Sequence, residues 1–336
     1  MTRDPTRTTE RPTLKTIAYM TGLGVATVSR ALADAPDISQ STKERVRLVA
    51  RQIGYRPNRA GVRLRTGKTN VISLILSVET EVLGLSSHLV YGLSDRLRAT
   101  PYHLVVTPYS TNDDPLEPVR YVVETGSADG VVFSRIELRD PRVQYLHDRN
   151  FPFATHGRTS MGLEHAFYDY DNHAYAETAV TSLAARGRRR LALLPPPAHL
   201  TYGTHMLLGF TAGIARHDLV EVPVHQVTSD SPPDRIIDHI TGMMAASNRP
   251  DGFVCASAAA AIAVISAAEE AGLVIGRDFD VAVKESFNMM RKFRREVIVL
   301  HEDFRAAGVG LADAVVKLID GEDPRALQVI QAPRLD

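Results

Sequence analysis

The sequence predicts an α/β protein in which a small helical domain precedes a larger body made of two lobes. Residues 12–56 contain three short helical patterns, with a glycine-containing turn between the first two. From residue 70 onward, apolar runs of strand length alternate with helical stretches. Continuous apolar strands separated by helices are typical of parallel sheets covered by helices on both faces. This alternation is too long for one open sheet, so two side-by-side α/β domains with a cleft between them are expected.

The charge of the chain is divided between its two parts. The 336 residues include 39 basic and 39 acidic side chains, so the total charge is zero. Residues 1–68 alone contain 14 basic and 5 acidic residues, a net charge of +9, and residues 69–336 have a net charge of −9. Although a zero total argues against nucleic-acid binding, a basic domain joined to an acidic body indicates a polyanionic partner for the N-terminal domain.

Several classes of protein are excluded by composition. The single cysteine, Cys255, rules out a disulfide framework or a cysteine-based zinc site within one chain, and its apolar neighbours predict a core position. The histidines lack the spacing of a zinc protease. No secretory signal is visible, and no apolar run approaches the roughly 18 residues of a membrane span. We therefore expect a soluble, cytoplasmic protein without a cofactor, metal or membrane partner.

Residues 12–56 are predicted to form a helix-turn-helix domain, with the motif itself at about residues 14–33. Apolar residues recur at helical spacing from Leu14, two glycines interrupt the period, and it resumes at Val25. A third helical stretch follows Ser39, whose side chain can cap the first turn. Three short helices with a tight turn between the first two are the arrangement of this DNA-binding motif.

The second helix of this domain is expected to read DNA bases. It should begin near Gly24 and bury Val28. Four side chains should face outward: Val25, Ala26, Ser29 and Arg30. Small side chains at the start of a recognition helix allow close approach to base edges and thymine methyl groups, and an arginine one turn later can reach a guanine or a phosphate. A helical cap without function is the alternative, which the charge of the segment disfavours.

Two segments flanking this domain are expected to be poorly ordered by themselves. Residues 1–11 are polar and rich in threonine, which predicts a disordered tail. Residues 57–69 have helical potential, but Val62 and Leu64 are their only large apolar side chains. Because this segment cannot bury enough surface to stand alone, we expect a hinge helix and linker that order only against a partner.

The body, residues 70–336, is predicted to alternate strands and helices. The expected strands are 71–78, 102–107, 130–134, 151–156, 190–194, 222–227, 252–256, 280–283 and 297–301. The expected helices are 89–98, 116–125, 172–186, 206–216, 234–246, 258–271 and 304–320. The basic run at residues 186–190 lies between a helix and a strand, where a solvated helix end is favoured over a second DNA site.

Residues 12–68 resemble the DNA-binding headpiece of the LacI/GalR family of bacterial transcription regulators. The resemblance rests on three segments: Thr-Leu-Lys-Thr-Ile-Ala at 13–18, Ala-Thr-Val-Ser-Arg-Ala-Leu at 26–32, and Gly-Tyr-Arg-Pro-Asn-Arg-Ala at 54–60. The downstream body is similar to the two-lobed, type I periplasmic-binding-protein fold of the same family. The resemblance therefore spans nearly the whole chain.

The resemblance implies specific DNA contacts. Val25 and Ala26 fall at the pair of positions that discriminates between operators, Arg30 matches a base-contacting arginine, and Leu64 falls where paired hinge helices insert a leucine into the minor groove. The family usually has Ser where Gly24 stands, so one hydroxyl contact to a phosphate is lost here. The candidate DNA contacts, including five positions that match phosphate contacts, are Thr13, Val25, Ala26, Thr27, Ser29, Arg30, Ser39, Thr42, Asn58, Arg59 and Leu64.

The resemblance also implies an effector pocket in the cleft of the body, at the carboxyl ends of the strands. Glu285 matches an acidic position that binds sugar hydroxyls, and Met206 replaces an arginine that forms a bidentate clamp. Ser257 replaces the family's asparagine, so a less polar pocket is expected, in which arginines supply a compensating cation. The candidate effector residues are Ser77, Arg135, Arg158, Asp171, Met206, Ser257 and Glu285.

The resemblance implies a transcription regulator of a metabolic operon rather than an enzyme. A homodimer would bind a palindromic operator in double-stranded DNA, as a repressor by default, and a small carbohydrate effector would control it by allostery. A non-sugar effector, a corepressor and an activator remain open alternatives. Residues 1–68 argue against a sugar-binding receptor, and the absence of a nucleophile elbow or Walker loop argues against an α/β enzyme.

Overall fold

The computed structural model describes residues 12–55, 67–77, 85–286 and 289–335. Internal contacts divide the chain into two units, Met1–Thr69 and Asn70–Asp336. The predicted tail at residues 1–11 and most of the predicted hinge at residues 57–69 lie outside the described residues.

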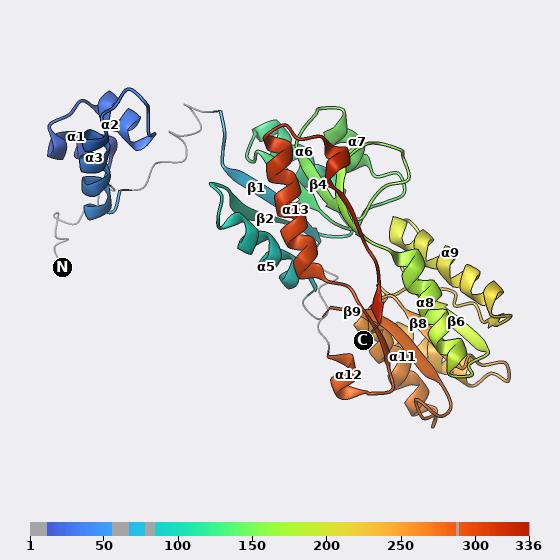
Figure 1. The fold of residues 1–336 in the computed structure, drawn as a ribbon. Helices are drawn as coiled ribbons and strands as arrows, with labels where there is room; N and C mark the ends of the chain where they lie inside the picture. Colours follow the sequence, from blue (N-terminus) through green and yellow to red (C-terminus); the bar gives the residue numbers. More distant parts are fainter. Residues whose placement is uncertain (1–11, 56–66, 78–84, 287–288, 336) are drawn as a thin grey trace, which may run out of the picture. The chain divides into compact units, whose positions relative to one another are not determined.

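The first unit is a bundle of three helices, as predicted (Figure 1). Its helices are α1 (Leu14–Thr21), α2 (Val25–Leu32) and α3 (Gln40–Gln52). The turn between α1 and α2 requires a left-handed backbone at Gly22, which has a φ of 67°. Ser39 caps α3 by accepting the backbone N–H of Thr42, as expected. The core side chains come from all three helices: Ile17, Ala18, Val28, Ala31, Val46 and Ala50.

The first lobe of the body contains a six-stranded parallel sheet in the order β11-β5-β4-β3-β1-β2. Its strands are β1 (Val71–Ser77), β2 (His103–Tyr109), β3 (Gly130–Phe133), β4 (Phe153–His156), β5 (Ala166–Tyr170) and β11 (Gln328–Gln331). Its helices are α5 (Leu85–Leu97), α6 (Leu116–Thr125), α7 (Pro141–His147) and α13 (Phe304–Ile319). Apolar residues of α5 and α13 pack on one face of the sheet, and those of α6 and α7 pack on the other.

The second lobe has a second six-stranded sheet, in the order β12-β10-β9-β8-β6-β7, which is parallel except for β12. The strands are β6 (Arg190–Leu194), β7 (Val220–Glu221), β8 (Gly252–Cys255), β9 (Asp280–Glu285), β10 (Ile298–His301) and β12 (Arg334–Leu335). The helices are α8 (Asn172–Ala185), α9 (Thr201–Arg216), α10 (Pro233–Met244), α11 (Ala258–Glu270) and α12 (Met290–Phe293). A 3-10 turn, η1 (Pro324–Leu327), precedes β11 of the first lobe. Cys255 is buried in the core of this lobe, as predicted.

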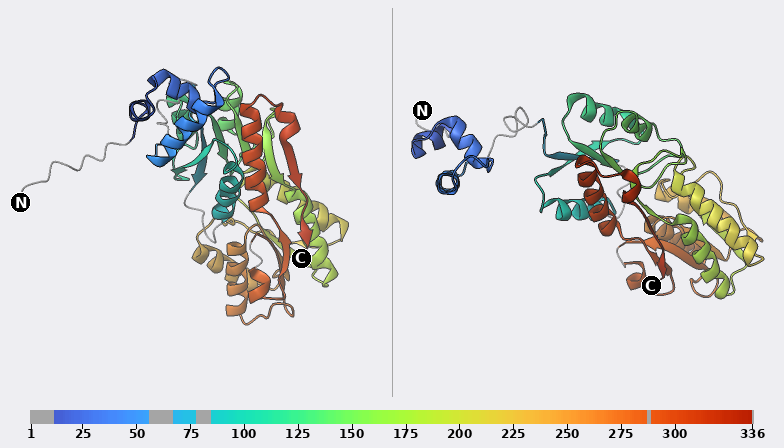
Figure 2. Two further views of the ribbon diagram at one scale, coloured as in Figure 1. Left: turned by 60° about the vertical axis from the view of Figure 1, so that its left-hand side comes forward. Right: turned by 45° about the horizontal axis from the view of Figure 1, so that its top comes forward.

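The chain crosses between the two lobes three times. The crossings run from β5 to α8, from β10 to α13, and from β11 to β12. Figure 2 shows α13 returning to the first lobe before the last residues run back to the second. Each lobe is therefore assembled from separate stretches of sequence, and the three crossing segments connect the two lobes.

Three predicted boundaries in the body were wrong, the first being that of α5, which begins at Leu85 instead of residue 89. The strand expected at residues 222–227 is only Val220–Glu221, because Pro223 has no N–H to donate and Gln226 adopts a left-handed backbone with a φ of 65°. Helix α9 begins at Thr201 instead of Met206. The first turn of α9 is polar and contains a glycine, so its sequence lacks apolar residues at helical spacing. In the structure, the backbone N–H of Thr201 in this turn donates to Ile136 O of the first lobe.

Helices α5 and α13 touch backbone to backbone at a pair of glycines, Gly92 and Gly308. A Cβ on Gly308 would lie 2.3 Å from Leu89 O. We therefore expect Gly308→Ala to lower the free energy of unfolding by about 1–3 kcal/mol, the usual cost of overpacking. Gly242→Ala is the matched control, because a Cβ there meets nothing within 4 Å; it should stabilise helix α10 by roughly 0.5–1 kcal/mol. Urea unfolding of both variants measures the difference, and equal effects would show that the close helix contact is absent.

Candidate functional site

The outward face of α2 carries the side chains that the sequence predicted to meet DNA. Val28 is fully buried, whereas Val25 is 41% exposed and Ala26 is also exposed. Arg30 lies one turn further along and forms an ion pair with Asp37. This arrangement leaves a shallow, small-residue surface at the start of the helix, which suits close approach to base edges in the major groove.

The predicted phosphate-contacting residues in this unit are placed at helix ends. Thr13 and Ser39 are the N-caps of α1 and α3, and Ser39 Oγ donates to Thr42 Oγ1 at 2.8 Å. Helix N-termini favour phosphate binding through free N–H groups and the helix dipole. The residues that remain exposed or half-exposed are Thr13, Val25, Ala26, Thr27, Ser29, Arg30, Ser39 and Thr42. Asn58, Arg59 and Leu64 lie outside the described residues.

Two cations of this unit are held by one carboxylate. Asp34 has a left-handed backbone, and its Oδ1 lies 3.1 Å from Lys43 Nζ and 2.7 Å from Arg47 Nη2. The hydrogen bond from Lys43 is the main reason why the pKa of Asp34 is lowered. These two cations join the loop after α2 to α3, so they support the position of α2.

A pocket of about 400 Å³ lies between the two lobes of the body, at the carboxyl ends of the strands of both sheets. Small-molecule sites in open α/β sheets occupy this position. Of the predicted effector residues, five line it: Ser77, Arg135, Arg158, Ser257 and Glu285.

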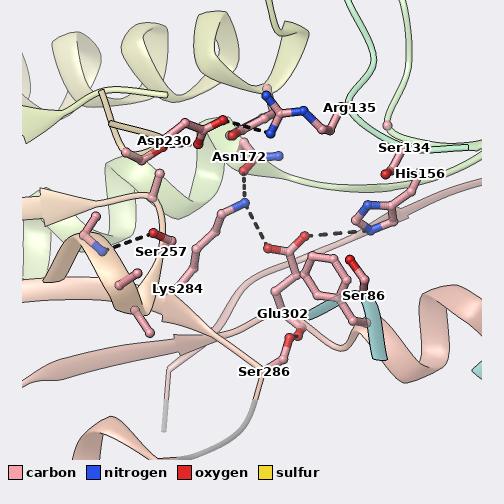
Figure 3. A pocket seen from close by; sticks show the side chains of 18 of the residues that line it. Ser86, Ser134, Arg135, His156, Asn172, Asp230, Ser257, Lys284, Ser286 and Glu302 are labelled. Carbon is pink, nitrogen blue, oxygen red and sulfur yellow. Dashed lines mark hydrogen bonds and ion pairs between the residues drawn. The ribbon is translucent and has the colours of Figure 1, made fainter. Parts of the chain in front are cut away.

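A charged cluster occupies the centre of the pocket (Figure 3). Lys284 Nζ lies 2.9 Å from Glu302 Oε2 and donates to Asn172 Oδ1, also at 2.9 Å. The other oxygen of Glu302 lies 3.8 Å from His156 Nε2. Burial lowers the pKa of His156, so its imidazole is neutral near pH 7. The lysine ammonium also lies 5.0 Å from the ring centre of Tyr202, within the range of a cation–π interaction.

An ion pair and a backbone hydrogen bond connect the two lobes on one side of the pocket. Arg135 Nη1 of the first lobe lies 2.8 Å from Asp230 Oδ2 of the second. Thr201 N donates to Ile136 O at 2.9 Å, which adds a backbone hydrogen bond between the lobes. Arg135 itself has a φ of 58°, and its carbonyl accepts a 2.8 Å hydrogen bond from the buried guanidinium of Arg142. The position of Arg135 is therefore fixed from within the first lobe.

Three buried polar atoms that line the pocket have no hydrogen-bond partner among the described residues: Ser77 Oγ, Thr201 Oγ1 and Asp169 Oδ2. Arg158 Nε lies 3.1 Å from Asp169 Oδ2, which satisfies an ion-pair distance but not hydrogen-bond geometry. Buried polar groups are nearly always hydrogen-bonded, and an unpartnered one destabilises the fold. All three atoms belong to residues of the pocket wall.

Burial raises the pKa of Asp169 to about 6, from its ordinary value of 3.8. The folded state therefore binds the proton more tightly than the unfolded state, and stability is lost as the pH rises from about 4 to above 6. We expect Asp169→Asn to abolish this pH-dependent loss, which amounts to about 3 kcal/mol of the free energy of unfolding. Urea unfolding of both proteins at pH 4 and pH 7.5 tests it: the variant should gain stability relative to the natural protein at the higher pH, and parallel pH dependences would contradict the assignment.

The structure corrects two of the predicted effector residues, Met206 and Asp171. Met206 is fully buried in the core of the second lobe, because it lies on the inward face of α9, one turn before Phe210. Asp171 caps α8 by accepting the N–H of Ala174 and does not line the pocket. Glu285 does line it, but its carboxylate accepts the backbone N–H groups of Met289 and Met290.

Sequence reasoning missed the residues at the centre of the pocket. We did not single out Lys284, Glu302, His156 or Asn172, all of which line the pocket. Their shared signal is position, because each lies at or just after the carboxyl end of a strand. Asn172 and Glu302 contact Lys284 directly, and His156 lies close to Glu302.

The basic run at residues 186–190 begins at the end of α8 with an exposed Arg186, as predicted, and two of its arginines also pair with a buried carboxylate. Asp280 is 1% exposed, and its two oxygens lie 2.6 Å from Arg186 Nη1 and Arg188 Nε. A buried carboxylate needs such partners. These arginines therefore stabilise the second lobe.

Comparisons with known proteins decide the family. The model of "Bacterial regulatory proteins, lacI family" matches residues 13–58, and that of "Periplasmic binding protein-like domain" matches residues 180–336. The HTH-type transcriptional regulator AglR of Rhizobium meliloti is 30% identical over 90% of this chain and 86% of its own length. The chain belongs to the LacI family. RafR of Escherichia coli, another HTH-type transcriptional regulator, is 29% identical over 95% of this chain and 96% of its own length.

Solved structures of LacI-family proteins have the same fold. A lac repressor dimer bound to operator and the anti-inducer ONPF matches with a TM-score of 0.81 and 19% identity, over 97% of this chain and 98% of its own. A complex of the transcriptional regulator CelR with cellobiose matches with a TM-score of 0.69 and 21% identity over the same shares. This LacI-family chain is therefore a DNA-binding transcriptional regulator, and its curated relatives are named as regulators rather than enzymes.

Neither a metal centre nor a membrane span is visible in the described ranges. There, no group of three or more His, Cys, Asp or Glu side chains is arranged to hold a metal ion. No helix in the same ranges combines the length and the apolar character that crossing a membrane requires.

Proposed function

We propose that this LacI-family regulator is a repressor of a metabolic operon, which binds a palindromic operator as a homodimer and is controlled by a carbohydrate in the cleft. The observation that carries the effector part is the pocket between the lobes, which is lined by polar and charged side chains of both. Sugar hydroxyls both donate and accept hydrogen bonds, so they can bind such side chains as well as the charged cluster around Lys284. The cytoplasm follows as the location, because the proposed DNA partner is there.

The proposed DNA contacts are the exposed side chains of α2 and the helix ends around it. Val25, Ala26 and Arg30 would meet base edges, while Ser29, Thr27 and the caps of α1 and α3 would lie against phosphates. For Asn58, Arg59 and Leu64 the proposal rests on the family resemblance alone. The net charge of +9 in residues 1–68 supports this orientation, because the body carries −9 and is repelled by DNA.

A homodimer is supported by exposed apolar side chains on the first lobe. β2 is an edge strand, and its Val105 and Val106 are each 42% exposed. Tyr91 of α5, on the same lobe, is also exposed. An apolar surface of this kind marks a protein–protein contact. One short recognition helix reads only a few base pairs, so two copies related by a two-fold axis suit a palindromic site.

Effector control requires that a ligand favour one arrangement of the lobes over the other. The pocket is lined by both lobes, and the Arg135–Asp230 ion pair joins them across it. A sugar that binds both walls therefore changes the balance between lobe arrangements, and with it the spacing of the two DNA-binding units. A corepressor would use the same pocket; it differs only in raising operator affinity instead of lowering it.

Thr201→Val tests the role of the unpartnered pocket hydroxyls. Without ligand, removing the Thr201 hydroxyl should leave the free energy of unfolding unchanged or raise it, because a buried polar atom without a partner is lost. Effector affinity should fall about tenfold, the value of roughly one hydrogen bond. Thr155→Val is the contrasting variant: Thr155 Oγ1 donates to Gly157 O at 2.6 Å, so its loss should destabilise the fold.

The measurement is a thermal-shift screen of sugars, followed by titration of the best ligand into the natural protein and Thr201→Val. The same sugar is then added to the protein on labelled DNA from the region upstream of its own gene. We expect it to weaken DNA binding about 5–150-fold, the usual range of allosteric coupling. A sugar that binds equally well to Thr201→Val would reject the pocket assignment. A screen without any stabilising sugar would reject the carbohydrate effector.

A further inference from the structure

The charges that face the pocket define the class of effector further. We propose that the effector is an uncharged polyol, a sugar without a phosphate or carboxylate group, and that the pocket discriminates against the phosphate ester of the same sugar. This inference rests on the proposed carbohydrate effector and adds its charge. The observations that support it are three ion pairs and an excess of carboxylates in the lining of the pocket.

Every lysine and arginine among the described lining residues already has a carboxylate partner. Lys284 Nζ is 2.9 Å from Glu302, Arg135 Nη1 is 2.8 Å from Asp230, and Arg158 Nε is 3.1 Å from Asp169. All three carboxylates line the same pocket. No cation in the described part of the lining is therefore free to neutralise an anionic ligand.

The carboxylates outnumber the cations. Glu285 is a fourth lining carboxylate, and it is held by backbone N–H groups rather than by a cation. The lining histidines do not restore the balance, because burial lowers the pKa of both His156 and His205 and leaves them uncharged near pH 7. The described lining of the pocket therefore has a net negative charge at neutral pH.

A phosphate group in this pocket would have to take a cation from its carboxylate. The carboxylate left behind would be buried without a partner; Glu302, for example, has only 6% of its side chain exposed. The N-termini of α9 and α11 open on the pocket, but each supplies only about half a positive charge, and Ser257 already caps α11. Neutral hydroxyls, in contrast, can donate to the carboxylates and bind the unpartnered oxygens while the ion pairs remain intact.

The test compares neutral sugars with their phosphate esters on the full-length protein. Glucose, cellobiose, maltose and sucrose are titrated beside the corresponding sugar phosphates by calorimetry at low and physiological salt. We expect the neutral member of the binding pair to bind at least tenfold more tightly than its phosphate ester. If the phosphate ester binds more tightly, the inference is wrong while the carbohydrate effector stands. If neither member of any pair binds, the carbohydrate effector itself is rejected, and the inference with it.

Asp230→Asn makes the cause of the discrimination testable. This variant removes one negative charge and frees Arg135, so the affinity for the phosphate ester should rise several-fold relative to the neutral sugar. Glu117→Gln is the matched control: it removes the same charge from a surface ion pair with Arg120, outside the pocket. The control should leave the ratio of the two affinities unchanged. An unchanged ratio in Asp230→Asn as well would overturn the charge argument.

Discussion

Replacing Val25 with glutamate is expected to abolish specific DNA binding while the protein stays folded. Val25 is the first residue of α2 and is 41% exposed, so the substitution does not disturb the core. A carboxylate at a helix N-terminus is even favourable for the helix itself. At the DNA surface, however, it would be desolvated against base edges and repelled by the phosphates.

The expected loss is about a hundredfold or more in operator affinity, because a buried, unpaired charge at an interface costs about 2–5 kcal/mol. Leu48→Glu is the matched control. Leu48 is an exposed apolar residue of α3, so a glutamate there is solvated and does not disturb the core. Fluorescence anisotropy with operator DNA compares the two variants, and equal affinities would show that α2 does not face the bases.

Replacing Lys284 with methionine is expected to destabilise the second lobe and to remove the effector response. Lys284 contacts Glu302 and Asn172 and lies against the ring of Tyr202. Without it, Glu302 keeps only the neutral imidazole of His156, at 3.8 Å. Breaking a buried ion pair from one side costs about 3–5 kcal/mol.

The double variant Lys284→Met with Glu302→Gln separates the ion pair from simple loss of packing. It leaves no uncompensated charge, so most of the stability should return, whereas effector binding should remain weak because the charged cluster is gone. Lys317→Met, which breaks a surface ion pair with Asp313, is the control and should change stability little. If Lys284→Met were as stable as this control, the central ion pair would not contribute to the fold.

The parts of the fold that were predicted correctly have strong local signals. The helix-turn-helix was visible because the spacing of Val28 and Ala31, the glycine turn and the Ser39 cap all indicate the same structure. The continuous apolar strands also predicted parallel sheets. Strands β11 and β12 were not predicted, because they are short, half-exposed segments at the end of the chain that form only by pairing with distant strands.

The pocket was harder to predict because it depends on which side chains point into the cleft. The resemblance led to Met206, but helix α9 turns that side chain into the core and turns Tyr202 and His205 toward the pocket. Lys284 and Glu302 lie at the ends of two successive strands and meet only because β9 and β10 are neighbours in the sheet and run parallel. Such pairs depend on strand register, which a single sequence does not show.

We propose that this chain reads a palindromic DNA sequence as a dimer. Selection of bound duplexes from a random DNA pool by the full-length protein, at physiological salt, measures whether it does. One motif with two inverted half-sites should be enriched, and Val25→Tyr should enrich a different motif or none. Enrichment of no motif, or of the same motif by Val25→Tyr, would contradict it.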